Sequence, residues 1–255
     1  MLSSLFTAFR MYSRIPVPEV EWNDRNRRYA LCFFPLVGAV IGGLLMLWNA
    51  VCRFLEIGSF LYAAVAVLIT VLVTGGIHLD GFCDTCDARA SWGGRDKKLK
   101  ILSDPHIGAF AAIKLCVYLI VLTAVFTELT DRGAAFAAAC GYVVSRALSG
   151  LAAVTFRAAK KEGSLYSFTA AADKKTAAVV LVLWAVLGCG AMIAVSPVTG
   201  LASSAAALLA MAYYRFIAYR FFGGITGDLA GWFLQVCELS VAAAAALSYR
   251  IMEVM

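Results

Sequence analysis

The sequence predicts an all-α protein, a polytopic helical bundle in a membrane, because of its hydrophobic content, its few charges and the length of its apolar runs. Hydrophobic residues make up 62% of the 255 residues and charged residues only 15%. Soluble domains have about 45–50% apolar and about 25% charged residues. One globule of this size cannot bury so much apolar surface, so lipid must cover the remainder. We therefore expect a single membrane domain over residues 1–255.

Seven apolar runs are long enough to cross the hydrocarbon core of a bilayer as helices, which takes about 20 residues. A turn-forming segment from Ser196 to Gly200 divides two of them, which would otherwise form one over-long helix. Seven is the predicted count, with six or eight as the alternatives; seven spans place the two ends of the chain on opposite sides of the membrane. The predicted spans are residues 30–51, 59–77, 108–127, 133–154, 177–196, 199–219 and 229–250.

The segment before the first span, residues 1–29, is expected to lie at the membrane surface. Apolar side chains from Leu2 to Phe9 recur at helical spacing, opposite serines and a threonine. Pro16 and Pro18 then end any helix. This pattern predicts a short interfacial helix on the inner leaflet.

Lys and Arg residues concentrate in alternate loops, which indicates the orientation of the chain. Short cytoplasmic loops retain Lys and Arg residues. Sixteen Lys and Arg residues lie in the N-terminal segment and in the second, fourth and sixth loops, whereas only three lie in the other loops and at the C-terminal end. The N-terminus is therefore predicted in the cytoplasm. Of the three cations within spans, Arg146 is the deepest, whereas Lys114 and Arg215 can reach the head groups. The net charge of +6 does not indicate nucleic-acid binding.

An acidic segment after the second span, residues 75–107, is expected to form the catalytic loop. Asp80, Asp84 and Asp87 are spaced i, i+4 and i+7, which places three carboxylates on one face of a helix. Three carboxylates repel one another unless a cation lies among them, and oxygen ligands favour Mg²⁺ or Mn²⁺. A solvated loop face fits poorly with the surrounding glycines and apolar residues. A zinc site at the CxxC motif lacks a second pair of ligands.

Two further polar segments lie at predicted span ends on the same membrane face. Asp104 and His106 precede the third span, near His78, the only other histidine. Asp104 is interpreted as a fourth metal ligand or as a base for an attacking hydroxyl, with a helix cap as the alternative. A glycine-rich turn, FFGGITGDLAG, opens the seventh span, where backbone N–H groups can bind an anion. Asp228 in this turn is alternatively a helix cap.

Together these motifs resemble the cobalamin synthase family, the adenosylcobinamide-GDP ribazoletransferases. The sequence GGIHLDGFCDTCDARAS at 75–91 is similar to the family signature GGxHLDGxxDTxDxxxS. One departure is His106, which stands where the family is expected to have an Arg, and Arg89 is a candidate for the missing charge. The resemblance continues in the same order at RIPVP (14–18), FPLVGA (34–39), DPHIG (104–108), SR (145–146), KEG (161–163) and GGITGD (223–228).

The resemblance implies a Mg²⁺-dependent enzyme that acts late in vitamin B12 biosynthesis in a bacterial or archaeal cytoplasmic (inner) membrane. A hydroxyl of α-ribazole, or of its 5′-phosphate, would attack the activated phosphate of adenosylcobinamide-GDP. GMP would leave, and adenosylcobalamin or its 5′-phosphate would form. The active site is expected to face the cytoplasm. Membrane lipid is a further expected partner, and assembly into a homo-oligomer is left open.

On this hypothesis, Mg²⁺ bound by Asp80, Asp84 and Asp87 neutralises the pyrophosphate and stabilises the charge on the departing GMP. The catalytic candidates are Asp84, Asp104 and His78, of which Asp104 or His78 accepts the proton of the attacking hydroxyl. The candidates for binding the substrates are Arg14, Arg89, His106, Arg146, Lys160, Lys161, Thr226 and Asp228.

Two other classes of protein remain as alternatives. A CDP-alcohol phosphotransferase-like enzyme also holds metal with aspartates at a membrane face. Its motif, DxxDGxxAR followed by GxxxDxxxD, is matched only in part, because the later glycine and twin aspartates are missing. A transporter would carry its intramembrane charges near the midplane, whereas these carboxylates gather at one face.

Overall fold

The computed structural model describes residues 1–255, apart from the side chain of Ser164. The described residues form helices joined by short turns, with no strand among them. A single isolated β-bridge pairs Ala158 with Ile225, where the segment before α9 lies beside the turn before α12. The structure therefore confirms the all-α class that the composition predicts.

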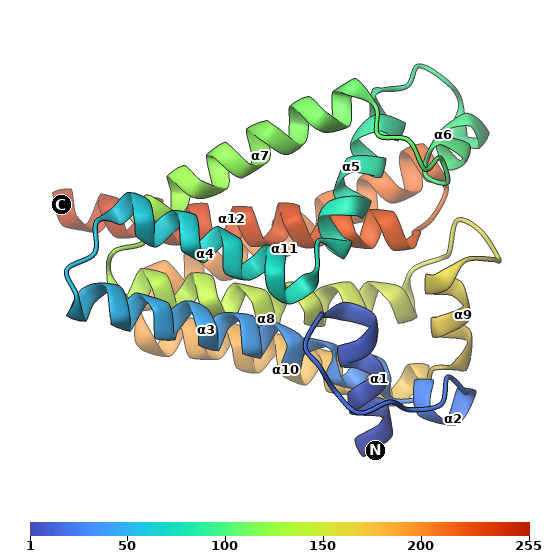
Figure 1. The fold of residues 1–255 in the computed structure, drawn as a ribbon, viewed down its shortest axis with the longest axis horizontal. Helices are drawn as coiled ribbons and strands as arrows, with labels where there is room; N and C mark the ends of the chain where they lie inside the picture. The colour runs from blue at the N-terminus through green and yellow to red at the C-terminus, as the bar shows by residue number, and fades with distance from the viewer.

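Seven long segments of the described chain make up the bundle, and all run along it except the second half of one, which turns across it (Figure 1). Six are single helices long and apolar enough to cross a membrane, and the seventh is a bent pair. The six single helices coincide with six predicted spans to within a few residues, whereas the predicted span 59–77 matches only the first half of the bent pair. The described chain thus has six membrane-spanning helices, or seven spans if the bent pair is one, in agreement with the predicted count of about seven. They are α3 (Phe34–Phe54, preceded by the turn η1, Ala30–Phe33), the bent pair α4 (Ser59–Thr74) and α5 (Ile77–Ala90), α7 (Ala109–Glu128), α8 (Arg132–Thr155), α10 (Lys174–Val195), α11 (Pro197–Ile217, continued by η2, Ala218–Phe222) and α12 (Gly227–Val254).

The short helices gather towards one end of the bundle, away from the C-terminus (Figure 1). This end carries the N-terminal segment and the second, fourth and sixth loops, which hold most of the Lys and Arg residues. The N-terminal helix is present, as its apolar spacing predicts. The short helices are α1 (Leu2–Tyr12), α2 (Asp24–Arg27), α6 (Arg95–Ile101) and α9 (Ser164–Ala171).

The chain turns by 94° between α4 and α5. Gly75 ends α4 and Gly76 precedes α5, with φ of 64° and 78°. This left-handed backbone is readily adopted only by glycine, so the glycine pair places the bend. The segment 75–107 is consequently no continuous loop: α5 and α6 occupy most of it, and the predicted span 59–77 ends at the bend.

Helices α3 and α8 pack at very short range through two glycines of α3. A Cβ built on Gly38 would collide with the backbone carbonyl of Tyr142, and one on Gly42 would lie 2.7 Å from the carbonyl oxygen of Ala139. Small residues allow helices to approach closely, which gives membrane bundles much of their packing energy. This contact fixes α8, and with it the wall of the cavity described below.

Replacing Gly38 by alanine is expected to destabilise the fold by about 1–3 kcal/mol, because an added methyl group forces α3 away from α8. The measurement is the thermal unfolding midpoint of the purified protein in detergent. Gly43→Ala is the matched control, since a Cβ there meets no described atom within 4 Å outside its own helix. Equal midpoints for the two variants would contradict this account of the packing.

Candidate functional site

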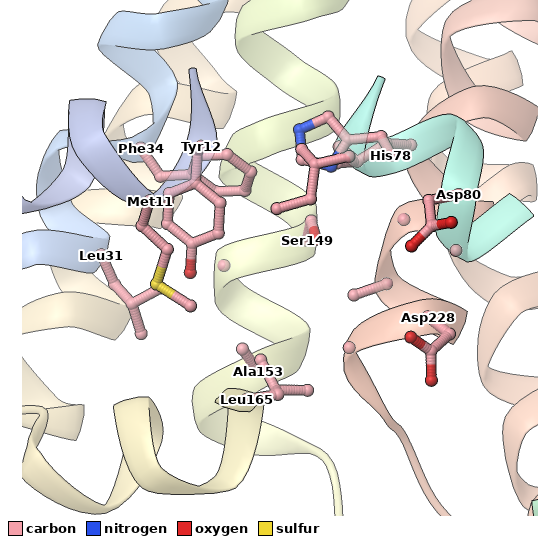
Figure 2. Close-up of a pocket in the computed structure, with 17 residues that line it drawn as sticks. Met11, Tyr12, Leu31, Phe34, His78, Asp80, Ser149, Ala153, Leu165 and Asp228 are labelled. Atoms are coloured by element: carbon pink, nitrogen blue, oxygen red, sulfur yellow. The ribbon is translucent and has the colours of Figure 1, made fainter. Parts of the chain in front are cut away.

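A cavity of about 290 Å³ lies between α1, α5, α8, α9 and α12, near the start of α3 (Figure 2). Its two sides differ in chemistry. Figure 2 shows the carboxylates of Asp80 and Asp228 on the side opposite the apolar residues, with Ser149 and Ala153 of α8 between them. The cavity can therefore bind a ligand with one polar and one apolar part. The apolar side is formed by Met11, Tyr12, Leu31 and Phe34.

The two carboxylates come together because α5 packs against the start of α12. Gly81 is the point of closest approach: a Cβ built on it would lie 2.8 Å from the Cα and the carbonyl oxygen of Asp228. Any larger residue would force the helices apart. Asp80, the neighbour of Gly81, is thereby held beside Asp228, 148 positions further along the chain.

Asp84 lies on the next turn of α5 and is partly buried. Its carboxyl group is close enough to Asp80, Asp87, Asp104 and Asp228 to interact electrostatically with all four. The three aspartates of α5 therefore share their surroundings with the aspartates that precede α7 and open α12. A cluster of carboxylates this dense is unfavourable unless protons or cations offset the repulsion.

Asp87 also makes a defined structural contact. One carboxylate oxygen accepts a hydrogen bond from the backbone N–H of Gly108 at 2.6 Å, and the other from that of Ala111 at 2.8 Å. These are free N–H groups of the first turn of α7, where a negative charge is favourable. Asp87 thus joins α5 to α7, a contact that the spacing of the aspartates does not reveal.

The donor chemistry of this region fits Mg²⁺. Among the described residues, no three His, Cys, Asp or Glu side chains converge closely enough to hold a metal ion by themselves. Mg²⁺, however, is usually bound by one or two carboxylates together with substrate phosphates. Asp80 and Asp228 offer two such carboxylates on one cavity wall. The metal site at Asp80, Asp84 and Asp87 itself remains a prediction.

Asp104 and His106 form an exposed pair before α7. Asp104 Oδ1 accepts a hydrogen bond from the backbone N–H of His106 at 3.0 Å and lies 2.8 Å from the ring Nδ1. The backbone hydrogen bond, and then the side-chain one, lower the pKa of the Asp104 carboxyl below its usual value. A carboxylate with a lowered pKa is a weaker general base. Gly108 is the N-cap of α7, so Asp104 is not the cap that the alternative interpretation proposed.

His78 is buried, with 5% of its surface exposed, and lines the cavity. Its ring lies on one side of the packed Tyr12 and Phe34 rings, with its centroid 6.5 Å from that of Tyr12 and 6.1 Å from that of Phe34. The Nε2 atom has no hydrogen-bond partner among the described residues. The structure therefore places this predicted catalytic residue in the cavity wall, with a ring nitrogen that is buried and has no hydrogen-bond partner among the described residues.

A second cavity of about 120 Å³ adjoins the first and shares Asp228 and Ala153 with it. Lys160 lines it and donates hydrogen bonds to the carbonyl of Leu99 at 2.9 Å and to Ser103 Oγ at 3.1 Å. Thr226 also lines it, and its hydroxyl accepts a hydrogen bond from the N–H of Leu229. Thr226 is therefore the cap of α12, in place of Asp228. Lys161, in contrast, is exposed and lies outside this lining.

Two predicted arginines lie on other surfaces. Arg14 lines a groove of about 680 Å³ that also includes Asp80, and its side chain passes directly over Gly75. Arg89 donates to the hydroxyl of Tyr213 at 3.0 Å and stacks over the ring of Trp232. Of the two, only Arg14 shares a surface with a cavity carboxylate.

Arg146 is fully buried and does not line either cavity. Its Nη1 lies 2.6 Å from Glu238 Oε1, so that α8 and α12 are joined by a buried ion pair. Ser145 Oγ donates to the same oxygen at 3.1 Å. The sequence analysis misses Glu238, although a signal exists: it is the only carboxylate within the seven predicted spans.

Comparison with known proteins identifies the family. The model of a family described as cobalamin-5-phosphate synthase matches residues 4–246. A relative named adenosylcobinamide-GDP ribazoletransferase, from Lachnoclostridium phytofermentans, is 44% identical over 97% of this chain and 94% of its own length.

Relatives with the same name from Chlorobium phaeovibrioides and Escherichia coli are 33% and 32% identical, over 98% and 93% of this chain and 99% and 97% of their own. No solved structure matches. The long match to the family model agrees with the acidic cluster, the cavity and the membrane-spanning helices. The chain therefore belongs to the cobalamin-5-phosphate synthase family and is a membrane-spanning transferase of cobalamin biosynthesis.

Proposed function

We propose that this enzyme joins α-ribazole, or its 5′-phosphate, to adenosylcobinamide-GDP and releases GMP. The nucleoside hydroxyl forms a new bond to the phosphorus on the cobinamide side of the pyrophosphate, and the bond from that phosphorus to GMP breaks. The hydroxyl proton passes to a base. The names of the relatives support both substrates. The structural observation that supports this proposal best is that Asp80 and Asp228, which are far apart in sequence, line the same cavity.

We further propose that the reaction requires Mg²⁺ held by Asp80, Asp84 and Asp87, with Asp228 nearby. The cation would neutralise the pyrophosphate and lower the energy of the charge that develops on GMP. The support is the density of carboxylates around Asp84 and the hard donors on the cavity wall.

Of the two proton acceptors predicted from sequence, His78 is the better supported. It lines the cavity, and its Nε2, although covered by neighbouring atoms, has no partner among the described residues. Asp104 is exposed, is hydrogen-bonded to His106 and has a lowered pKa. A base must reach the proton that it accepts, which favours the residue in the cavity wall.

The active site is proposed to face the cytoplasm from the inner membrane. The support is that the acidic helix α5 lies towards the end of the bundle where the Lys- and Arg-rich loops meet (Figure 1). Such loops stay in the cytoplasm. Accessibility of an introduced cysteine in the loop after α6, in intact cells against inverted vesicles, tests the orientation.

The reaction is tested by incubating purified protein, in detergent or liposomes, with adenosylcobinamide-GDP, Mg²⁺ and either form of α-ribazole. Mass spectrometry is expected to detect GMP together with a cobalamin product. Samples treated with EDTA and samples of the Asp84→Asn variant serve as controls. A folded wild-type protein that forms no product from either nucleoside would contradict the proposal.

A further inference from the structure

Aromatic rings from four separate segments meet at the apolar side of the 290 Å³ cavity. Tyr12 of α1 is central: its ring centroid lies 4.1 Å from that of Phe34, and the ring of Phe168 in α9, which does not itself line the cavity, stands edge-on at 5.9 Å. The ring of His78 lies parallel to that of Tyr12 within 28°. Such a cluster offers flat apolar surfaces on which planar aromatic groups bind well.

The buried ring of His78 gives a second and independent indication of a ligand. Its Nε2 lacks a partner within the described part of the chain, although buried polar atoms in folded proteins are almost always hydrogen-bonded. His78 lines the cavity, but its Nε2 is covered by neighbouring atoms, so a polar atom of a bound ligand can supply the missing contact only if the cavity wall shifts on binding. The ligand therefore needs a polar atom close to its planar apolar part.

The dimensions of the cavity restrict the ligand further. About 290 Å³ is at the lower limit of small-molecule sites, which run from about 300 to 1,000 Å³. A nucleoside is of this size, whereas the complete adenosylcobinamide-GDP molecule is several times larger. The adjoining 120 Å³ cavity has space for the 5′ end of such a nucleoside, and Lys160 lines it together with Glu162 and Asp228.

We propose that this cavity is the nucleoside site of the enzyme and that its apolar side selects the base. The planar base lies against Tyr12 and Phe34, and the ribose hydroxyls face His78 and the carboxylate of Asp80. This inference rests on the proposed function and adds which substrate occupies the cavity and which residues choose among bases. Apart from the hydroxyl of Tyr12, the described residues of the apolar side carry no hydrogen-bonding side-chain group. This side therefore favours methylated, weakly polar bases over bases with exocyclic amino or carbonyl groups, which would lose hydrogen bonds to water.

The first test measures nucleoside binding without the corrinoid substrate, by calorimetry on the full-length protein in detergent. Each buried methyl group adds about fourfold to affinity. An α-ribazole analogue that lacks both methyl groups of the base is therefore expected to bind about 15-fold more weakly. An analogue with an adenine base is expected to bind more weakly still.

The second test fills the cavity. Ala153→Phe places a ring in the space of the nucleoside and is expected to weaken α-ribazole binding at least 30-fold. Binding of adenosylcobinamide-GDP, followed by corrin absorbance, and the size-exclusion profile are expected to stay unchanged. The matched control is Ala205→Phe, at an exposed position of α11, which is expected to bind α-ribazole as the wild type does.

Tyr12→Leu is the second variant, in case the larger side chain at 153 prevents folding. Loss of the central ring is expected to weaken α-ribazole binding about tenfold. The KM for α-ribazole is expected to rise by the same factors in the two variants, while kcat stays within threefold of the wild-type value. This kinetic measurement also applies if the enzyme binds the nucleoside only after the corrinoid substrate.

The outcomes separate this inference from the proposed function. If the wild type is active and both variants keep its nucleoside affinity and its KM for the nucleoside, the nucleoside site is overturned and the proposed function stays intact. Equal affinity for the methylated and unmethylated nucleosides would overturn the role of the apolar wall. A folded wild type that neither binds α-ribazole nor forms a cobalamin would overturn the proposed function, and the nucleoside site with it.

Discussion

Replacing Glu238 by alanine is expected to destabilise the protein by about 3–5 kcal/mol, the largest single effect on stability that we expect. The reason is the burial of its partner: Arg146 has no exposed surface, and its Nη1 lies 2.6 Å from Glu238 Oε1. Without Glu238, the guanidinium stays desolvated and uncompensated between α8 and α12. The measurement is the unfolding midpoint of purified protein in detergent, followed by tryptophan fluorescence.

Two variants show whether the pair itself is responsible. Arg146→Met combined with Glu238→Leu removes both charges and is expected to recover most of the lost stability, as in other buried pairs. Glu128→Ala breaks the exposed pair with Arg250 and is expected to cost less than about 1 kcal/mol. If Glu238→Ala destabilises no more than Glu128→Ala, the structural role of the pair is contradicted.

The same double variant tests the predicted substrate contact of Arg146. A side chain that only joins α8 to α12 can be replaced together with its partner while turnover continues. A phosphate ligand cannot, because the substrate would lose a charge-assisted contact. If the double variant is folded and has a normal KM for adenosylcobinamide-GDP, Arg146 has a structural role and does not bind the substrate.

The membrane-spanning helices could be predicted because their length and composition are set by the bilayer and by local chemistry. A run of about 20 apolar residues is a property of sequence alone. The break between α10 and α11 is equally local: α10 ends at Val195, and Pro197 begins α11, a position that proline favours.

The contacts that build the site could not be predicted, because they join residues far apart in sequence. Asp228 reaches Asp80 only because Gly81 lets α5 approach the backbone of α12. The helical spacing correctly places Asp80, Asp84 and Asp87 on a helix, but it carries no information on what approaches that helix. The start of α7 lies beside Asp87, and its backbone N–H groups donate hydrogen bonds to both carboxylate oxygens.

Replacing Asp80, Asp84 or Asp228 by asparagine is expected to lower kcat/KM by about 10³-fold or more while the unfolding midpoint changes little. Asparagine keeps the size of the side chain but removes the negative charge that a cation requires. EDTA is expected to abolish turnover, and added Mg²⁺ to restore it in the wild type only. The measurement is the rate of GMP release over a range of Mg²⁺ concentrations.

Asp87→Asn separates a metal ligand from a structural contact. Asparagine has one acceptor oxygen where the carboxylate has two, so either Gly108 or Ala111 loses a hydrogen bond and the unfolding midpoint is expected to fall. If Asp87 also holds the metal, turnover stays low at every Mg²⁺ concentration; if it only caps α7, turnover recovers once the protein is kept cold and folded. Normal turnover of Asp84→Asn at saturating Mg²⁺ would contradict the metal assignment altogether, because Asp84 is the carboxylate that interacts with all four of the others in the cluster.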